Sequence, residues 1–188
     1  MGCKSIKDKE SRKSIDEKGI NHQNKKKEYK KISMDIIKFS KDALNQHNKY
    51  RKEHNASPLE LDNDLQNYAQ NHAEEMAKKN EIFHSNCVLN NDVIGENIYS
   101  NQKIFTGTEL TDEFYKDIQF YDFNENECVI KASNFTQLIW KNTQYVGFGV
   151  AYNLKTGNLF AVAIYSPPGN ELGNYKNNVE NKINEKNL

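Results

Sequence analysis

The sequence predicts an α+β domain in which helices pack around an antiparallel sheet. Residues 62–80 repeat apolar side chains at steps of three and four, which indicates an amphipathic helix. Residues 144–152 and 158–166 are apolar segments separated by "NLKTGN", a pattern that indicates an antiparallel hairpin. Helices grouped around an antiparallel sheet are typical of the α+β class.

A first helix is predicted over residues 40–54, where Ser40 is a suitable N-terminal cap. Five residues fall on one face of this helix at helical spacing: Ala43, Leu44, His47, Tyr50 and Arg51. The helix is expected to end before Pro58, because proline disfavours helical geometry at the residue that precedes it.

The second helix, over residues 62–80, has the clearest pattern. Its stripe consists of Leu65, Tyr68, Ala69, His72, Ala73, Met76 and Ala77. Asp62 or Asn63 is expected to cap its start, and two lysines suit the partial negative charge at its end. We interpret the stripe as core, and His72 as a packed or half-exposed helix histidine.

Two shorter helices and one edge strand complete the predicted domain. A third helix covers about residues 108–121, with an inward face of Leu110, Phe114, Ile118 and Tyr121. A fourth follows Ser133 and buries Phe135, Leu138 and Ile139. Residues 97–100 are expected to add an edge strand. The Asn- and Lys-rich chain after residue 170 has little to bury and is expected to fray.

The 188 residues suit one domain, but their zero net charge hides an asymmetry. Residues 1–38 hold twelve Lys/Arg and six Asp/Glu, a net charge of +6, whereas residues 39–188 hold fourteen and twenty, a net charge of −6. A basic arm on an acidic domain suggests an anionic partner, either a membrane surface or nucleic acid. Nucleic acid is disfavoured, because no aromatic residues interleave with the basic ones to stack on bases.

The start of the chain, "MGCKSIK", suggests lipidation. Gly2 is exposed once Met1 is removed, as N-myristoylation requires, and Cys3 is placed for palmitoylation. The motif is imperfect, because Ile6 stands where Ser or Thr is expected. Two interpretations stay open: a membrane anchor reinforced by basic residues, or an ordinary charged terminus.

The apolar runs and the cysteines indicate in which cellular compartment the protein is located. The longest apolar run, residues 159–165, is far shorter than the roughly 20 residues of a membrane span, and no secretory signal follows the charged start. The three cysteines are an odd, low number: Cys3, Cys87 and Cys128. Either Cys87 and Cys128 form one bridge or both are reduced thiols, and the low number favours thiols. We therefore expect a cytosolic or cytosol-facing location.

Four short motifs follow one another in a specific order: "HNKYR" (47–51), "GENIY" (95–99), "NFTQLIWKNT" (134–143) and "YSPPGN" (165–170). Together they resemble the CAP superfamily, also called the SCP/TAPS or pathogenesis-related-1 family. The chain is most similar to the Golgi-associated, cytosol-facing branch of that family. The resemblance divides the chain into a basic arm (1–38), a CAP domain (39–171) and a polar C-terminal tail (172–188).

The resemblance implies an α-β-α sandwich with a cleft that holds two histidines and two acidic residues, and in some members the histidines bind zinc. Matched by motif, these positions are His84, Glu96, Asp117 and, in place of the second histidine, Asn134. A neutral amide is a poor zinc ligand. Two interpretations remain: a weak metal site at His84, Glu96 and Asp117, or a polar cluster in which His84 hydrogen-bonds Glu96. Ligand chemistry favours the second, so no cofactor and no catalytic residue are expected.

Three classes of function remain after the resemblance. The favoured one is a non-enzymatic, membrane-associated protein that binds a lipid, either a sterol or an anionic phospholipid, since similar proteins bind such lipids. The alternatives are a metal-dependent hydrolase at an altered His/Glu cleft and a homodimeric scaffold for other proteins. The favoured location is the cytosolic face of the Golgi or plasma membrane, or the cytoplasm, with unconventional export to the extracellular space as the alternative.

Overall fold

The structure, a computed structural model, describes residues 35–125 and 127–183. Residues 1–34 of the predicted arm, which include Gly2 and Cys3, lie outside the described residues. The helices and strands are α2 (Ile36–Glu53), β1 (Glu60–Leu61), α3 (Asn63–Lys79), β2 (Val88–Leu89), β3 (Asp92–Val93), β4 (Gly95–Asn101), α4 (Gly107–Tyr115), the 3₁₀ helices η1 (Lys116–Phe120) and η2 (Ile130–Ala132), α5 (Ser133–Leu138), β5 (Tyr145–Tyr152), β6 (Leu159–Ser166) and α6 (Tyr175–Asn178). Among these helices, none is both long enough and apolar enough for a membrane crossing.

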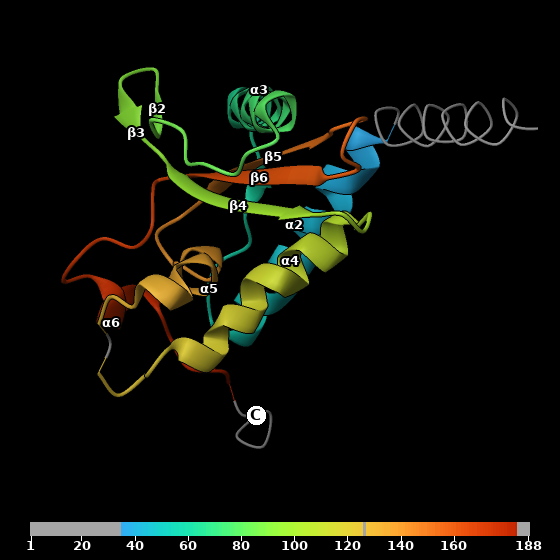
Figure 1. The fold of residues 1–188 in the computed structure, drawn as a ribbon. Helices are drawn as coiled ribbons and strands as arrows, with labels where there is room; N and C mark the ends of the chain where they lie inside the picture. Colours follow the sequence, from blue (N-terminus) through green and yellow to red (C-terminus); the bar gives the residue numbers. More distant parts are fainter. Residues whose placement is uncertain (1–34, 126, 184–188) are drawn as a thin grey trace, which may run out of the picture. The chain divides into compact units, whose positions relative to one another are not determined.

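The main sheet has the strand order β1-β5-β6-β4 (Figure 1). The predicted hairpin is present, with β5 antiparallel to β6, and β4 is the antiparallel edge strand expected around residues 97–100. The expectation of a purely antiparallel sheet is wrong at the other edge, because β1 runs parallel to β5. A parallel neighbour is allowed here because most of the domain separates the two strands in sequence.

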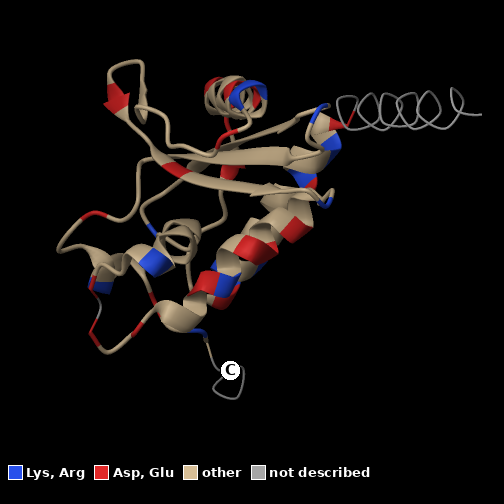
Figure 2. Ribbon diagram, viewed as in Figure 1, with Lys and Arg blue, Asp and Glu red and all other residues tan. Residues whose placement is uncertain are grey.

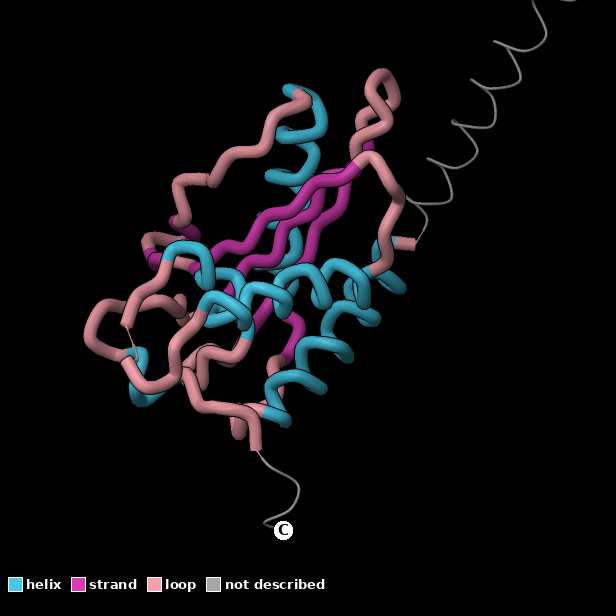
Figure 3. Tube along the Cα trace, turned by 60° about the horizontal axis from the view of Figure 1, so that its bottom comes forward, coloured by secondary structure: helices cyan, strands magenta, loops and turns pink. Residues whose placement is uncertain are grey.

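Helices cover both faces of the sheet, which gives the α-β-α sandwich. Helix α3 lies over one face, while α2, α4 and α5 lie on the other, and a second view shows the same layers (Figures 1 and 3). Strands β5 and β6 carry no charged residue, whereas charges follow the outer surfaces of α3 and α4 (Figure 2). Strands β5 and β6 therefore form the apolar centre of the middle layer.

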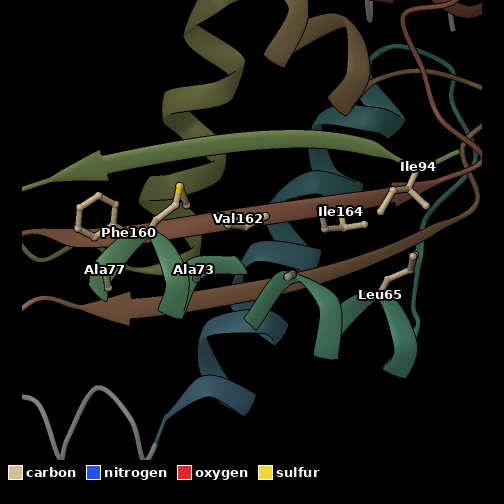
Figure 4. Close-up of a cluster of buried hydrophobic side chains, with 9 residues drawn as sticks. Leu65, Ala73, Ala77, Ile94, Phe160, Val162 and Ile164 are labelled. Atoms are coloured by element: carbon tan, nitrogen blue, oxygen red, sulfur yellow. The ribbon is translucent and has the colours of Figure 1, made fainter. Parts of the chain in front are cut away.

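The layer between α3 and the sheet contains a tight apolar cluster (Figure 4). It joins the helix stripe with residues of β6 and includes Leu65, Ala73, Ala77, Phe160, Val162 and Ile164. The helix lies very close to β5. A Cβ atom added at Gly147 would lie only 2.1 Å from the backbone nitrogen of Gln66. The small residues on both surfaces set this spacing.

Helix α3 begins and ends much as its sequence predicts. The Asp62 carboxylate accepts a hydrogen bond from the backbone nitrogen of Leu65 at 2.9 Å, which is an N-terminal cap. Helix α2, in contrast, begins four residues before the predicted cap Ser40, which is buried inside the helix. The ring of Phe39 packs near that of Phe105, with centroids 6.4 Å apart, so tertiary contacts extend this helix beyond the predicted start.

The predicted third helix is interrupted. It is α-helical to Tyr115 and then continues as the 3₁₀ helix η1 to Phe120. A 3₁₀ helix has three residues per turn, so the inward face predicted from the α-helical period shifts after the change. Phe114 and Tyr121 are buried as predicted, but Ile118 is only partly buried.

The C-terminal segment is packed over its described part, where fraying was expected. Tyr175 and Val179 of the predicted polar tail are each 2% exposed. Tyr175 lies edge-on to Trp140, with ring centroids 5.1 Å apart, and the carbonyl of Glu180 accepts a hydrogen bond from Nδ1 of His54 at 2.7 Å. Two apolar residues four positions apart are enough to bury one side of this segment, so the domain continues past residue 171.

The guanidinium of Arg51 lies in the interior and ties loops together. It is 0% exposed and donates to the carbonyl oxygens of Ser57 (2.7 Å), Leu138 (3.0 Å), Trp140 (2.8 Å) and Thr143 (2.9 Å). Burial lowers the pKa of Arg51 to about 10, so it remains a cation at neutral pH. Carbonyl dipoles take the place of a carboxylate partner.

His47 is a second buried motif residue. Its environment predicts that the folded domain loses stability in acid. Its Nδ1 donates to the carbonyl of Ala43 and its Nε2 accepts from the hydroxyl of Tyr165, each at 2.9 Å. Burial lowers the pKa of His47 from 6.5 to about 3. The unfolded chain therefore binds this proton first, so stability is retained above pH 6.5 and lost as pH falls toward 3.

We expect urea unfolding from about pH 7 to about pH 4 to show a falling free energy of unfolding. His47→Gln should be less stable at neutral pH but should show a shallower decline on acidification. A decline of unchanged slope in that variant would assign the acid sensitivity to other groups.

Candidate functional site

Glu96 and His84 form a close pair at the edge of the sheet. Glu96 is the one charged residue of β4. Its carboxylate accepts from Nδ1 of His84 at 2.6 Å and from the backbone nitrogen of Ser85 at 3.0 Å. The Glu96 side chain is 1% exposed and that of His84 is 64% exposed. A buried carboxylate thus orients an exposed imidazole and leaves its Nε2 available to solvent.

His72 is the site residue that sequence reasoning missed. It is 5% exposed, its Nε2 donates to the carbonyl of Phe83 at 2.8 Å, and the same nitrogen lies 3.6 Å from Oε1 of Glu96. The family motifs assign no role to this position. A signal was present nonetheless, because a histidine on the core stripe of a helix needs a polar partner.

Asp117 and Asn134 form the second pair. The amide of Asn134 donates to the carboxylate of Asp117 at 2.9 Å, and its backbone carbonyl accepts from the side chain of Asn97 at the same distance. Burial raises the pKa of the Asp117 carboxyl, and the hydrogen bond from Asn134 opposes that rise. Asn134 therefore links α5 to both η1 and β4.

The described contacts join the four family-matched residues as two pairs rather than one cluster. Successive residues of a strand face opposite sides of a sheet. Glu96 accordingly meets His84 beside α3, whereas Asn97 reaches α5 on the other side. The "GEN" motif thus places Glu96 and Asn97 on opposite sides of β4.

These residues do not fit a zinc ion. A zinc site that keeps an open position usually has three protein ligands drawn from imidazole, thiolate and carboxylate. Within residues 35–125 and 127–183, no three His, Cys, Asp or Glu residues are grouped to hold a metal. Asn134 offers an amide that already donates to Asp117, so the second pair contributes no imidazole.

Two cysteines lie in the described part of the chain. Cys87 and Cys128 are both free, so the alternative of a bridge between them is not realised. Burial raises the pKa of the Cys87 thiol, which makes it a weaker nucleophile at neutral pH.

Comparison with known proteins gives a consistent result. A model of the family described as "CAP: Cysteine-rich secretory protein family" matches residues 44–165. The chain is 34% identical over 132 residues to Golgi-associated plant pathogenesis-related protein 1 of Homo sapiens, covering 70% of this chain and 84% of that protein. It is 30% identical over 133 residues to the basic form of pathogenesis-related protein 1 of Nicotiana tabacum, covering 70% and 72%.

A solved structure supports the same fold. Venom allergen-like protein 4 of Schistosoma mansoni superposes with a TM-score of 0.60 at 18% identity, covering 79% of this chain and 97% of that one. At this identity, the likeness concerns the fold alone.

Proposed function

Because this chain belongs to the CAP family, we propose that it is a non-enzymatic, membrane-associated CAP-domain protein that binds lipid headgroups through its basic arm. The non-enzymatic part is supported by Asn134, whose amide is a structural link where the family pattern has an imidazole. The altered pair has neither the ligands of a catalytic metal nor an activated nucleophile.

The membrane part of the proposal is supported by the concentration of positive charge at the start of the chain. Residues 1–38 have a net charge of +6 and begin with Gly2 and Cys3, two residues that take acyl chains. Anionic lipid surfaces attract such segments by about 1 kcal/mol per Lys or Arg. The Golgi association named for the human relative supports the same location for this chain.

Vesicle binding tests the proposal directly. We expect the full chain to bind phosphatidylserine-containing vesicles, and Lys25→Gln/Lys26→Gln/Lys27→Gln to weaken this binding by about 3 kcal/mol, roughly a hundredfold. A matched control changes three exposed lysines of α2: Lys41, Lys49 and Lys52. If both triple variants bind equally well, the arm is not the membrane contact, and sterol-containing vesicles become the next probe.

Zinc addition tests the loss of the metal site. We expect zinc to leave the melting temperature of the natural chain within about 1 °C, since ligands that do not bind contribute no linkage. Asn134→His supplies an imidazole beside Asp117 and is the matched gain-of-ligand variant. If zinc raises the melting temperature of the variant alone, the asparagine at position 134 is what prevents zinc binding. If zinc raises the melting temperature of both proteins, the proposed non-metal role is contradicted.

A second candidate function is proton transfer by the His84–Glu96 pair. It is favoured by one observation, the carboxylate that fixes His84 with Nε2 outward. This is the arrangement of a general base oriented by an acid. Hydrolysis of p-nitrophenyl esters that disappears in His84→Gln would favour this candidate over the non-enzymatic role.

A further inference from the structure

A cavity of about 670 Å³ lies among three loops and includes none of the four family-matched residues. Its walls come from the segment before β1, the segment between α5 and β5, and the turn after β6. The residues that matter here are Pro58, Glu60, Asn142, Gln144, Tyr145 and Glu171. This volume is typical of sites that hold small ligands or short peptide segments.

The three walls are held together by hydrogen bonds of three buried side chains: Arg51, Thr143 and Gln137. Arg51 donates to Ser57 in the first wall and to Thr143 in the second. The Thr143 hydroxyl donates to the carbonyl of Pro167 in the third wall at 2.9 Å, and Gln137 accepts from the backbone nitrogen of Gly169 at 2.7 Å. The cavity is therefore preformed, so an occupant need not order its walls.

The charges of the cavity are not balanced. Its lysine, Lys141, is ion-paired with Glu180. Across the described part of the chain, no ion pair involves Glu60 or Glu171, and both residues are exposed. The Glu171 carboxylate accepts from the neutral side-chain amide of Asn174 at 3.0 Å. Two carboxylates without a cation favour a positively charged occupant and disfavour an anionic headgroup.

The remaining lining suits a polypeptide. The side chains of Asn142, Gln144 and Tyr145 are exposed and take part in no hydrogen bond among the described residues. An amide side chain offers one acceptor and two donors, the groups that pair with a peptide backbone. Pro58 and its neighbouring prolines add apolar surface for the aliphatic stem of a long side chain.

From these observations we propose that the cavity binds an extended segment of a partner protein that carries lysine or arginine. The carboxylates of Glu60 and Glu171 contact the cation, and the amides of Asn142 and Gln144 contact the backbone of the segment. This site is separate from the proposed membrane contact, because none of its lining residues belongs to the basic arm.

The test uses the full chain and acetylated, amidated tetralysine as the probe, followed by amide chemical shifts. We expect saturable shifts around Gln144 and Tyr145, and Glu60→Gln/Glu171→Gln to weaken the affinity about tenfold. Glu81→Gln/Glu127→Gln removes the same charge at two exposed residues outside the cavity lining and should leave the affinity unchanged.

Three outcomes would overturn the proposal. Equal weakening by both double variants would show attraction to net charge alone. Chemical-shift changes at residues away from the cavity would show that the probe binds elsewhere on the protein. Shifts caused by a neutral chitotriose probe but not by tetralysine would make the cavity a carbohydrate site. None of these outcomes bears on vesicle binding by the arm.

Discussion

Arg51→Met should lower the free energy of unfolding by about 4 kcal/mol, with a fall in melting temperature of about 10 °C. The guanidinium is fully buried and donates to four backbone carbonyls, one in the segment before β1 and three between the end of α5 and the start of β5. Methionine fills similar space but leaves these acceptors without donors, and each buried unsatisfied group costs about 1–3 kcal/mol. The loops that Arg51 ties together would also lose their common anchor.

Two controls separate this effect from charge and side-chain length. Arg51→Lys keeps the charge but cannot direct donors to four acceptors, so we expect an intermediate loss. Lys52→Met changes an exposed neighbour on the same helix and should cost less than about 0.5 kcal/mol. Denaturant unfolding measures all three, and an Arg51→Met chain as stable as Lys52→Met would show that the four hydrogen bonds contribute little.

Gly147→Ala should destabilise the domain by at least about 3 kcal/mol. The added Cβ would lie 2.1 Å from the nitrogen of Gln66 and 2.2 Å from the carbonyl carbon of Leu65. Both are backbone atoms of α3, so no side chain can rotate away. The helix must therefore move off the sheet and separate the apolar cluster between them.

Gly173→Ala is the matched control for the second prediction. Nothing lies within 4 Å of a Cβ atom at this glycine, but its φ of +82° is unfavourable for alanine. We expect a loss of about 1 kcal/mol from backbone strain alone. Thermal unfolding of the two variants would thus separate strain from overlap, and equal losses would contradict the steric argument at Gly147.

Local patterns in the sequence were enough to predict most of the fold. The stripe of α3, its Asp62 cap and the β5–β6 hairpin depend on periodicity, capping and turn chemistry, which are properties of neighbouring residues. The exceptions depend on distant contacts. The parallel pairing of β1 and the early start of α2 require partners that no local pattern contains.

The candidate site was less predictable. The motifs identified His84, Glu96, Asp117 and Asn134, but not that their contacts form two pairs. His72 approaches Glu96 only because α3 packs over the face of the sheet on which the Glu96 side chain lies. The C-terminal segment was missed for a similar reason. Tyr175 and Val179 are isolated apolar residues in a polar sequence, and both are buried, with the ring of Tyr175 against that of Trp140.

The buried motif residues have a consequence for how such chains diverge. Arg51, His47 and Asn97 hold loops, helices and strands in place, and all are 0–1% exposed. Substitution at these positions threatens folding, whereas the fold accommodates an asparagine at position 134, where the family resemblance implies a histidine. Descendants of one ancestor can therefore keep the recognisable signature while the chemistry of the cleft drifts. Kinship detected through that signature reports a shared architecture, and the occupant of each member's cleft has to be established one protein at a time.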